Sequence, residues 1–265
     1  MVSNEQSTLN LKEQICYQTQ GEGIGSVYER LQLADLFLKL AGEFSFKSIL
    51  ELQGLEITKG LDNIFWQNLG AEISLCDAPG VLEIVKKCWF LPDPPEYVTS
   101  SHLAEKERTF DLVWNFAQIQ QKPELLEDMK KLSHKYLLIF VPNYFNWGTP
   151  FHEIYHLIFR KPCQHAERGF KRLRHRAGLR KFLQSQKLKI IKEDYIDAPL
   201  LPDIGFSIRE LKQTIGLKVK ELGSEKISGL HVMEKALKMI NFEKNKMMLF
   251  SHHLYFFCEV NLENH

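Results

Sequence analysis

The stretch from residue 47 to residue 79, KSILELQGLEITKGLDNIFWQNLGAEISLCDAP, constrains the fold more than any other part of the chain. It has the pattern of a strand, a glycine-containing loop, a helix and a second strand, and an acid ends each strand, Glu51 and Asp77. In a parallel βαβ unit the first loop and the tip of the second strand lie side by side, at the edge where open α/β folds bind nucleotide-like ligands. An acid 26 residues after Glu51 is placed to accept hydrogen bonds from ribose hydroxyls.

Strand-like and helix-like segments alternate along the rest of the chain. Helices are expected at 26–41, 61–69, 81–88, 124–133, 151–187 and 207–240, and strands at 48–52, 71–77, 97–100, 110–116, 135–141, 188–196 and 248–260. The last two strands lack an ordinary crossover helix between them, which favours an antiparallel edge. The pattern predicts an α/β fold with a doubly wound, mostly parallel seven-stranded sheet, an antiparallel edge strand and helical insertions.

Length and composition fit a single domain of an ordinary globular protein. We expect one domain over residues 1–265, with a helical lead at 1–46 and helical cover insertions at 144–187 and 204–245. The net charge of +1 argues against a general electrostatic role on nucleic acid. The absence of a long apolar run and the polar start predict neither a transmembrane helix nor a signal peptide. Five scattered cysteines, never in CxxC spacing, favour reduced thiols in a cytoplasmic protein.

The order of four segments carries a family resemblance. SILELQG, GAEISLCDAP, FDLVWNFAQIQ and KYLLIFVPN follow one another as in class I S-adenosylmethionine (SAM) dependent methyltransferases, and the similarity spans about residues 28–200. The strand at 248–260 fits the antiparallel edge of that family. The resemblance implies SAM as the cofactor. The resemblance also implies that Glu51 and the glycine loop hold the methionine part of SAM, and that Asp77 binds the ribose.

The resemblance also implies which residues contact the cofactor. Carried over position by position, they are Glu51, Gln53, Gly54, Gly60, Asp77, Ala78, Ser101, His102, Asn115 and Phe116. Glycine lets the backbone approach a ligand closely, and a carboxylate can fix a diol through two hydrogen bonds.

The chain departs from the family pattern in the first loop. The family motif E-x-G-x-G-x-G here reads ELQGLEITKG, with Gln53 and Leu55 at two of the expected glycines. A run of Thr99, Ser100 and Ser101 replaces the acid commonly expected before the fourth strand. Two hypotheses therefore stand beside each other: productive SAM binding, and a methyltransferase fold whose cofactor site has been lost or reassigned.

The leading functional hypothesis is methyl transfer to a small-molecule acceptor, and an anionic acceptor is slightly favoured. SAM supplies its own leaving group, so alignment of the methyl donor with the acceptor is the main catalytic task. Tyr144, His152 and His156 follow the carboxyl end of a central strand and are candidates for acceptor contact or a general base. Histidines packed or solvated in a covering helix explain the pattern equally well. A non-catalytic binding or scaffold protein is the alternative, and methylation of RNA or protein a weaker one.

Two short motifs suggest other chemistry. HEIYH at 152–156, with Cys163 and His165 after it, matches the HExxH pattern of zinc proteases. It follows a strand of an α/β sheet rather than lying in a zincin context, so no metal is expected. GEGIG at 21–25 lacks the preceding strand of a dinucleotide fingerprint. It serves as a flexible lead into the helix at 26–41, or it closes over a cofactor with Tyr28 and Arg30 as contacts.

Residues 160–181 are strongly basic, with nine Lys or Arg against one Glu. A solvated helix face explains them, and so does contact with an anionic substrate, a membrane surface or nucleic acid. An anionic small molecule is favoured among these partners, because the segment borders the predicted cleft. Peripheral membrane contact through this segment stays open. No aromatic-rich basic platform for single-stranded RNA is evident, and the sequence does not indicate an oligomeric state.

Overall fold

The computed structural model describes residues 24–89, 91–103, 109–151, 154, 171–198 and 248–260. The chain divides into two compact units. Unit 1 comprises Met1–Leu33, Asn143–Glu167 and Tyr195–His252, and unit 2 comprises Ala34–Pro142, Arg168–Asp194 and His253–His265. The predictions of one domain with a helical lead and two cover insertions stay predictions.

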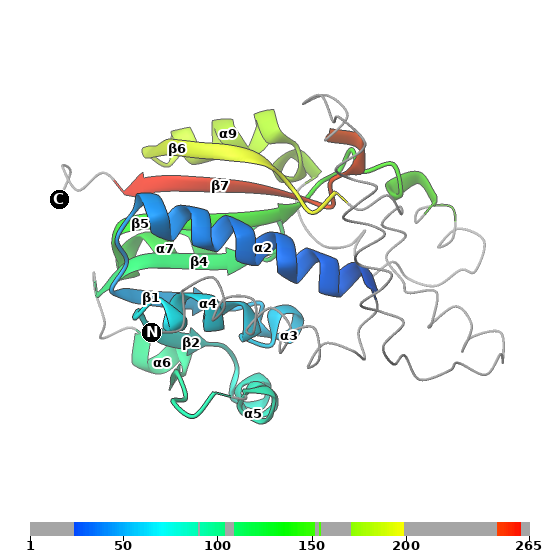
Figure 1. Ribbon diagram of the computed structural model, residues 1–265. Helices are drawn as coiled ribbons and strands as arrows, with labels where there is room; N and C mark the ends of the chain where they lie inside the picture. The colour runs from blue at the N-terminus through cyan, green and yellow to red at the C-terminus, as the bar shows by residue number, and fades with distance from the viewer. Residues whose placement is uncertain are drawn as a thin grey trace, which may run out of the picture. The chain divides into compact units, whose positions relative to one another are not determined.

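A seven-stranded sheet, which belongs to unit 2 except for the last two residues of β6, organises the fold (Figure 1). Its strands are β1 (Ser48–Leu52), β2 (Glu72–Cys76), β3 (Glu96–Val98), β4 (Phe110–Phe116), β5 (Ser133–Pro142), β6 (Leu188–Ile196) and β7 (His253–Val260). The strand order is β3-β2-β1-β4-β5-β7-β6. β1 pairs in parallel with β2 and β4, β2 with β3, and β4 with β5, whereas β7 is antiparallel to β5. The predicted doubly wound sheet with an antiparallel edge is confirmed.

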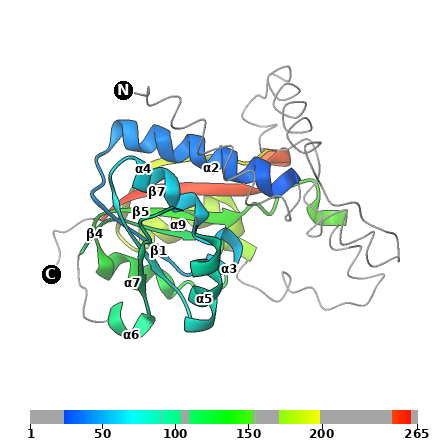
Figure 2. The same cartoon turned by 60° about the horizontal axis from the view of Figure 1, so that its bottom comes forward.

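Helices cover both faces of this sheet. They are α2 (Ile24–Glu43), α3 (Leu55–Thr58), η1 (Leu61–Asn63), α4 (Ile64–Asn68), α5 (Pro79–Cys88), α6 (Ser100–Leu103), α7 (Leu125–Leu132), η2 (Lys171–Arg174) and α9 (Arg176–Ser185). Within unit 2, α4 and the half of α2 from Ala34 onward lie on one face, and α7 lies on the other (Figures 1 and 2). This arrangement explains why every residue of β4 is buried, as expected for a strand covered on both sides.

Aromatic side chains form the centre of the core in unit 2. The ring of Phe37 from α2 stacks on Trp66 of α4 with 4.7 Å between centroids, and it meets Trp114 of β4 edge-on at 5.2 Å. Phe140 of β5 lies 6.1 Å from Trp114 in another edge-on contact. All four side chains are fully buried, and such pairs stabilise a fold beyond their buried area.

Several element boundaries differ from the sequence prediction. The last strand starts at His253 and not at 248, because residues 248–250 are helical. The helix expected at 81 begins at Pro79, since the fixed φ of proline suits the first helical position. The strand expected at 97–100 ends at Val98, and Ser100 begins α6. The helix expected at 207–240 lies outside the described residues.

Within the described part of the chain, no helix is long and apolar enough to cross a membrane. The three described cysteines, Cys76, Cys88 and Cys258, are free thiols. Burial raises the pKa of the Cys258 thiol to about 12, and this keeps it protonated and unreactive at neutral pH.

Asp111 ties β4 to its neighbours at the amino edge of the sheet. Its carboxylate accepts hydrogen bonds from the backbone amides of Lys47 at 2.7 Å and Ser48 at 3.3 Å, and it pairs with His134 at 3.0 Å and Lys135 at 2.5 Å. Burial raises the pKa of Asp111, but the hydrogen bonds from Lys135, Lys47 and Ser48 outweigh it and hold the pKa below its ordinary value of 3.8. Asp111 therefore stabilises the fold as an anion.

We expect Asp111→Asn to lower the free energy of unfolding at neutral pH by on the order of 1–3 kcal/mol, the value of hydrogen bonds to a charged group. The pKa of Asp111 is lower in the folded state, so its stabilisation is present above the unfolded-state pKa and is lost as pH falls through the folded-state pKa. Urea denaturation of both proteins at neutral pH and at successively lower pH should show the gap closing. Exposed Asp93, changed to Asn, is the control. A gap that stays constant through acid pH would contradict this account.

Candidate functional site

The carboxyl ends of the parallel strands meet at one edge of the sheet in unit 2. The register pairs Leu52 of β1 with Cys76 of β2, and Cys76 with Val98 of β3. The residues that directly follow these strands therefore lie in a row at the same edge: Gln53, Asp77 and Thr99. Polar groups thus follow each of three neighbouring strands where open α/β sheets bind ligands.

The loop after β1 has an unusual backbone conformation. Gln53 and Gly54 are both left-handed, with φ of 60° and 87°. A residue with a side chain is strained in this region, and such strain is concentrated at ligand sites, where the surrounding structure enforces it. The Gln53 amide donates to the Cys76 carbonyl at 2.7 Å and so holds the loop beside β2. The backbone therefore takes at Gln53 a conformation that glycine normally supplies.

Gly54 lets this loop pack against the end of β4. A Cβ atom built on Gly54 would lie 2.7 Å from the carbonyl oxygen of Phe116. No side chain fits between two backbone segments at that distance. The position requires glycine for two reasons, its left-handed φ and this close approach.

Asp77 links the end of β2 to the loop. One carboxylate oxygen accepts a hydrogen bond from the amide of Leu55, the first residue of α3, at 3.1 Å. The other accepts one from the amide of Ala78 at 2.7 Å. A carboxylate has about four acceptor positions, so this half-buried group can still accept hydrogen bonds from a ligand.

Glu51 supports the loop from inside. Its side chain is fully buried and accepts hydrogen bonds from the Thr58 hydroxyl and the Asn63 side-chain amide. Asn63 in turn accepts a hydrogen bond from the indole of Trp114 at 2.9 Å. This network connects β1, the loop and β4. Glu51 therefore holds the loop in shape and presents no surface to a ligand in this conformation.

Asn115 and Phe116 are also fully buried at the end of β4. The Asn115 side chain donates to the carbonyl of Leu52 at 2.7 Å and accepts from the amide of Gln118 at 3.1 Å. It thereby fixes the end of β1 to the turn after β4.

Gly60, at φ 72°, is buried against Leu75, whose side chain would lie 2.7 Å from an added Cβ. These residues shape the edge of the sheet, and direct contact with a cofactor stays a prediction for them.

Other predicted cofactor residues are accessible. Ala78, Ser101 and His102 are exposed. The Thr99 hydroxyl lies 2.9 Å from the Ser101 hydroxyl and 2.8 Å from Nδ1 of His102. Because Thr99 follows β3 directly beside β2, this polar group neighbours Asp77 at the carboxyl edge.

Two asparagines organise unit 1. The side-chain amide of Asn143 donates to the carbonyls of Met248 at 2.6 Å and Ser251 at 2.9 Å. That of Asn146 donates to the carbonyls of Phe250 and Ser251, both at 3.1 Å. Both asparagines are buried, and together they fasten the segment after β5 to the segment before β7.

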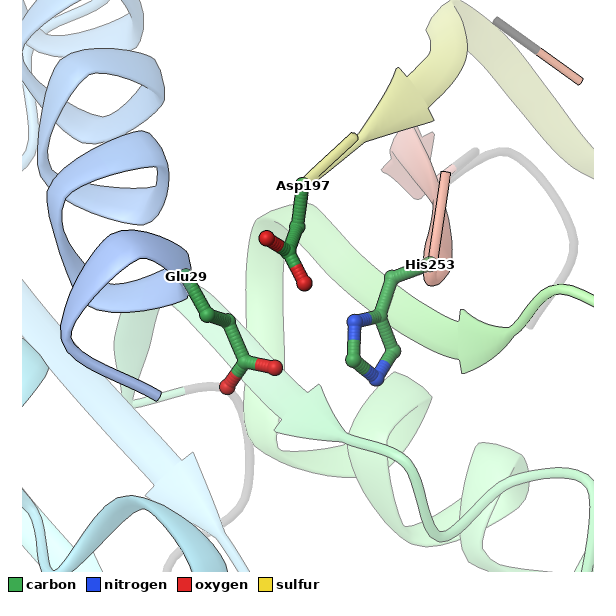
Figure 3. A group of neighbouring side chains, drawn as sticks. All are labelled: Glu29, Asp197 and His253. Atoms are coloured by element: carbon green, nitrogen blue, oxygen red, sulfur yellow. The ribbon is translucent and has the colours of Figure 1, made fainter. Parts of the chain in front are cut away.

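Unit 1 also contains a histidine held by a buried carboxylate. Nδ1 of His252 lies 2.9 Å from a carboxylate oxygen of Asp197, and the His252 amide donates to the Asp197 carbonyl at 2.7 Å. Figure 3 shows Glu29 of α2 directed towards Asp197, with one oxygen of each carboxylate within 4.8 Å of the other. His253, which Figure 3 also labels, belongs to unit 2, where its ring packs 4.8 Å from that of Phe116.

The sequence-predicted catalytic residues are only partly described. Tyr144 is half-buried, and its ring lies 6.0 Å from that of Phe145. His152 and His156 lie outside the described residues, as do Cys163 and His165, so the base and metal hypotheses for them stay predictions. Tyr28 and Arg30, expected as cofactor contacts, are both 3% exposed and stay predictions too. The sequence analysis missed the pair of His252 and Asp197, whose only signal is the SHH that precedes an apolar strand.

Part of the basic segment 160–181 has an internal role. Leu173 and Leu179 are buried. Arg176 and Arg180 each donate from Nε to the carboxylate of Glu193 on β6, at 3.0 Å. Burial raises the pKa of Glu193, but the hydrogen bonds from Arg180 and Arg176 outweigh it and hold the pKa below its ordinary value. These two arginines are therefore engaged within unit 2.

Comparison of the sequence with protein-family models and with curated proteins gave no match. The structure, in contrast, resembles solved methyltransferases. One is magnesium protoporphyrin IX methyltransferase from Synechocystis PCC 6803 with bound S-adenosylhomocysteine (SAH), with a TM-score of 0.50 and 11% identity over 89% of this chain and 84% of that chain. Another is a chain of the complex between the Haloferax volcanii Trm112 methyltransferase activator and a methyltransferase. It has a TM-score of 0.52 and 14% identity over 91% of this chain and 96% of that chain. At these identities the likeness concerns the fold.

Proposed function

We propose that this chain, which has the fold of class I SAM-dependent methyltransferases, binds SAM and transfers its methyl group to a small-molecule acceptor. One observation carries the proposal: the loop after β1 has consecutive left-handed residues at Gln53 and Gly54 and is bound to Asp77 through the Leu55 amide. The solved neighbour with bound SAH supports this class of cofactor.

The residues at the carboxyl edge of unit 2 divide into two roles. Asp77 would accept hydrogen bonds from the ribose hydroxyls, while the backbone at Gln53 and Gly54 would lie along the methionine part. Ala78, Ser101 and His102, which are exposed, would contact the adenine. The buried residues Glu51, Gly60, Asn115 and Phe116 would hold this surface in shape. Such a preformed surface is what a cofactor site requires.

SAM would supply both the methyl group and the sulfonium leaving group. The chain must then align the acceptor and, for a hydroxyl or amine acceptor, take up its proton. Tyr144, His152 and His156 remain candidates for contact with the acceptor.

A non-catalytic binding protein is the alternative function. Its support is the loop sequence, in which Gln53 and Leu55 replace two glycines of the family pattern. Leu55 is fully buried, so its side chain contributes to the core of unit 2. The conformation of Gln53 weighs against this alternative, because the loop keeps its left-handed backbone without the glycine.

Calorimetric titration of the full chain with SAM and with SAH tests the cofactor. We expect saturable binding of both, and no comparable binding of NAD, because the downstream strands resemble those of SAM enzymes. If neither SAM nor SAH produces heat at concentrations able to detect micromolar affinity, the proposed function is wrong.

Label transfer tests the acceptor. The protein is incubated with methyl-labelled SAM and a cell extract, and labelled small molecules are separated from labelled RNA and protein. Label in the small-molecule fraction is the expected result. Label confined to RNA or protein would replace the small-molecule acceptor with a macromolecular one. SAH binding with no labelled product would favour the binding protein.

A further inference from the structure

The turn after β4 has a strained backbone, as the loop after β1 does. Ala117 is left-handed, with φ of 56°, although alanine has no preference for this region. Its amide donates to the Phe140 carbonyl at 3.1 Å, and the Asn115 side chain accepts a hydrogen bond from the Gln118 amide at the same distance. Strain of this kind is enforced by the surrounding structure and is concentrated at ligand sites. The carboxyl edge of unit 2 therefore has two strained segments, one after β1 and one after β4.

These two segments pack against each other. β1 and β4 are neighbouring parallel strands, with Glu51 paired with Trp114, so the segments that follow them start side by side (Figure 1). Cγ of Gln118 would lie 3.5 Å from a Cβ atom added to Gly54. The Lys122 amide donates to the Gln118 carbonyl at 2.9 Å, and this bond closes the turn. The turn therefore presents its own side chains beside the loop.

One cation reaches from the turn to the loop. The Lys122 ammonium group donates a hydrogen bond to Oε1 of Gln53 at 3.3 Å. Gln53 is half-buried and neutral, whereas Lys122 is exposed. In the part of the chain that the structure describes, Lys122 forms no ion pair with a carboxylate. An ammonium group has three donor hydrogens, so two remain for an anionic ligand.

Opposite charges thus lie on the two sides of the loop after β1. On the β2 side the Asp77 carboxylate accepts from the Leu55 amide, and on the β4 side Lys122 donates to Gln53. β2 and β4 are both neighbours of β1, so their ends lie roughly 10 Å apart, twice the spacing between adjacent strands. An anion and a cation at this separation complement a ligand with hydroxyl groups in one part and a carboxylate in another. SAM and SAH have these groups, a ribose diol and the carboxylate of the methionine part.

We propose that Lys122 binds the methionine carboxylate of SAM and SAH, and that Gln53 positions the Lys122 ammonium group for this contact. The side chain at position 53, where the family pattern has glycine, then has a function of its own. Lys122 makes the site selective for ligands that have a carboxylate over ligands that have only the adenosine part. This role of Lys122 rests on the proposed function, the binding of SAM.

Calorimetric titration of the full chain with two ligands tests the proposal. The ligands are SAH and its decarboxylated analogue, S-adenosyl-3-thiopropylamine, which lacks only the carboxylate. Lys122→Met should bind SAH about five- to tenfold more weakly, because it loses a charge-assisted hydrogen bond that is partly exposed to solvent. The same variant should bind the analogue no more weakly than wild type does. Lys122→Arg keeps the charge and should retain most of the affinity for SAH.

A second variant tests the contact without removing the cation. Gln53→Glu places a carboxylate beside Lys122 that engages the ammonium group, so it should weaken SAH binding without weakening binding of the analogue. Lys131→Met is the matched control. Lys131 is also exposed, but it lies in the last turn of α7, directly before β5 begins at the opposite edge of the sheet. This variant should bind both ligands like wild type.

Salt dependence gives an independent measurement with SAH alone. Added salt screens the attraction between the ammonium group and the carboxylate, so it should weaken SAH binding more in wild type than in Lys122→Met. Equal salt dependence in the two proteins would contradict the proposed ion pair.

The outcomes distinguish failure of this proposal from failure of the proposed function. No SAH binding by wild type would contradict the function itself. If wild type binds SAH and Lys122→Met binds it equally well, only the assignment of Lys122 is wrong. Equal losses of affinity for SAH and for the analogue would also overturn it, because Lys122 would then support the loop without contacting the carboxylate.

Discussion

Replacing Asp77 with alanine should abolish SAH binding while the chain stays folded. A hydrogen bond to a charged group contributes roughly 1.5–3 kcal/mol, so the loss of two bonds to a ribose weakens binding by about a hundredfold or more. The variant also frees the Leu55 amide, which Asp77 holds at 3.1 Å, and this loosens the loop that should contact the methionine part. Calorimetric titration with SAH measures the loss directly.

Two further variants separate these effects of Asp77. Asp77→Asn keeps an oxygen for the Leu55 amide but loses the charge, so it should restore part of the binding. Glu56→Ala removes the same charge from an exposed position of α3 in the same loop and should bind like wild type. If Asp77→Ala binds SAH like wild type, the ribose assignment is wrong, although wild-type binding would still support the cofactor.

The strand pattern of the chain predicts the carboxyl edge well. Short apolar runs bounded by Glu51 and Asp77 define two parallel strands, and the register places Gln53 and Asp77 at one edge as expected. The direction of the Glu51 side chain, in contrast, could not be predicted from the sequence. β1 is buried on both faces, so its sequence shows no alternation from which to read that Glu51 faces Thr58 and Asn63.

The conformation of the loop could not be predicted either. Glutamine has no preference for positive φ, so the left-handed backbone at Gln53 is imposed by its surroundings. The loop can therefore adopt the left-handed backbone at Gln53 without the glycine that the family pattern has at this position. In this chain the close approach of Gly54 to Phe116 and the bond from Leu55 to Asp77 set the loop geometry.

The pairing of His252 with Asp197 depends on tertiary structure. The two residues are 55 positions apart, and each directly follows or precedes a strand of the sheet edge. The sequence predicts a strand at 248–260 that contains both His252 and His253, and this assignment indicates no partner for either side chain. The strand begins at His253, so His252 lies outside it and can meet the end of β6.

Gly54→Ala should cause a larger loss of stability than Gly70→Ala, the substitution of another left-handed glycine of unit 2. At φ 87° a side chain is strained by roughly 1–2 kcal/mol. The added Cβ would also lie 2.7 Å from the Phe116 carbonyl, and relief of such a contact costs about 1–3 kcal/mol more. Urea denaturation should therefore show a loss of about 2–5 kcal/mol, the sum of the two terms.

Gly70→Ala is the matched control, because it isolates the backbone term. Gly70 has almost the same φ, 88°, but no atom lies within 4 Å of its added Cβ. It should lose only the roughly 1–2 kcal/mol of backbone strain and keep wild-type SAH affinity. Gly54→Ala should lose SAH binding even where it remains folded, since relief of the clash moves the loop away from β4. Equal losses of stability in the two variants would mean that the loop shifts to relieve the clash at little cost in free energy. In that case the close packing of Gly54 on Phe116 does not fix the cofactor surface.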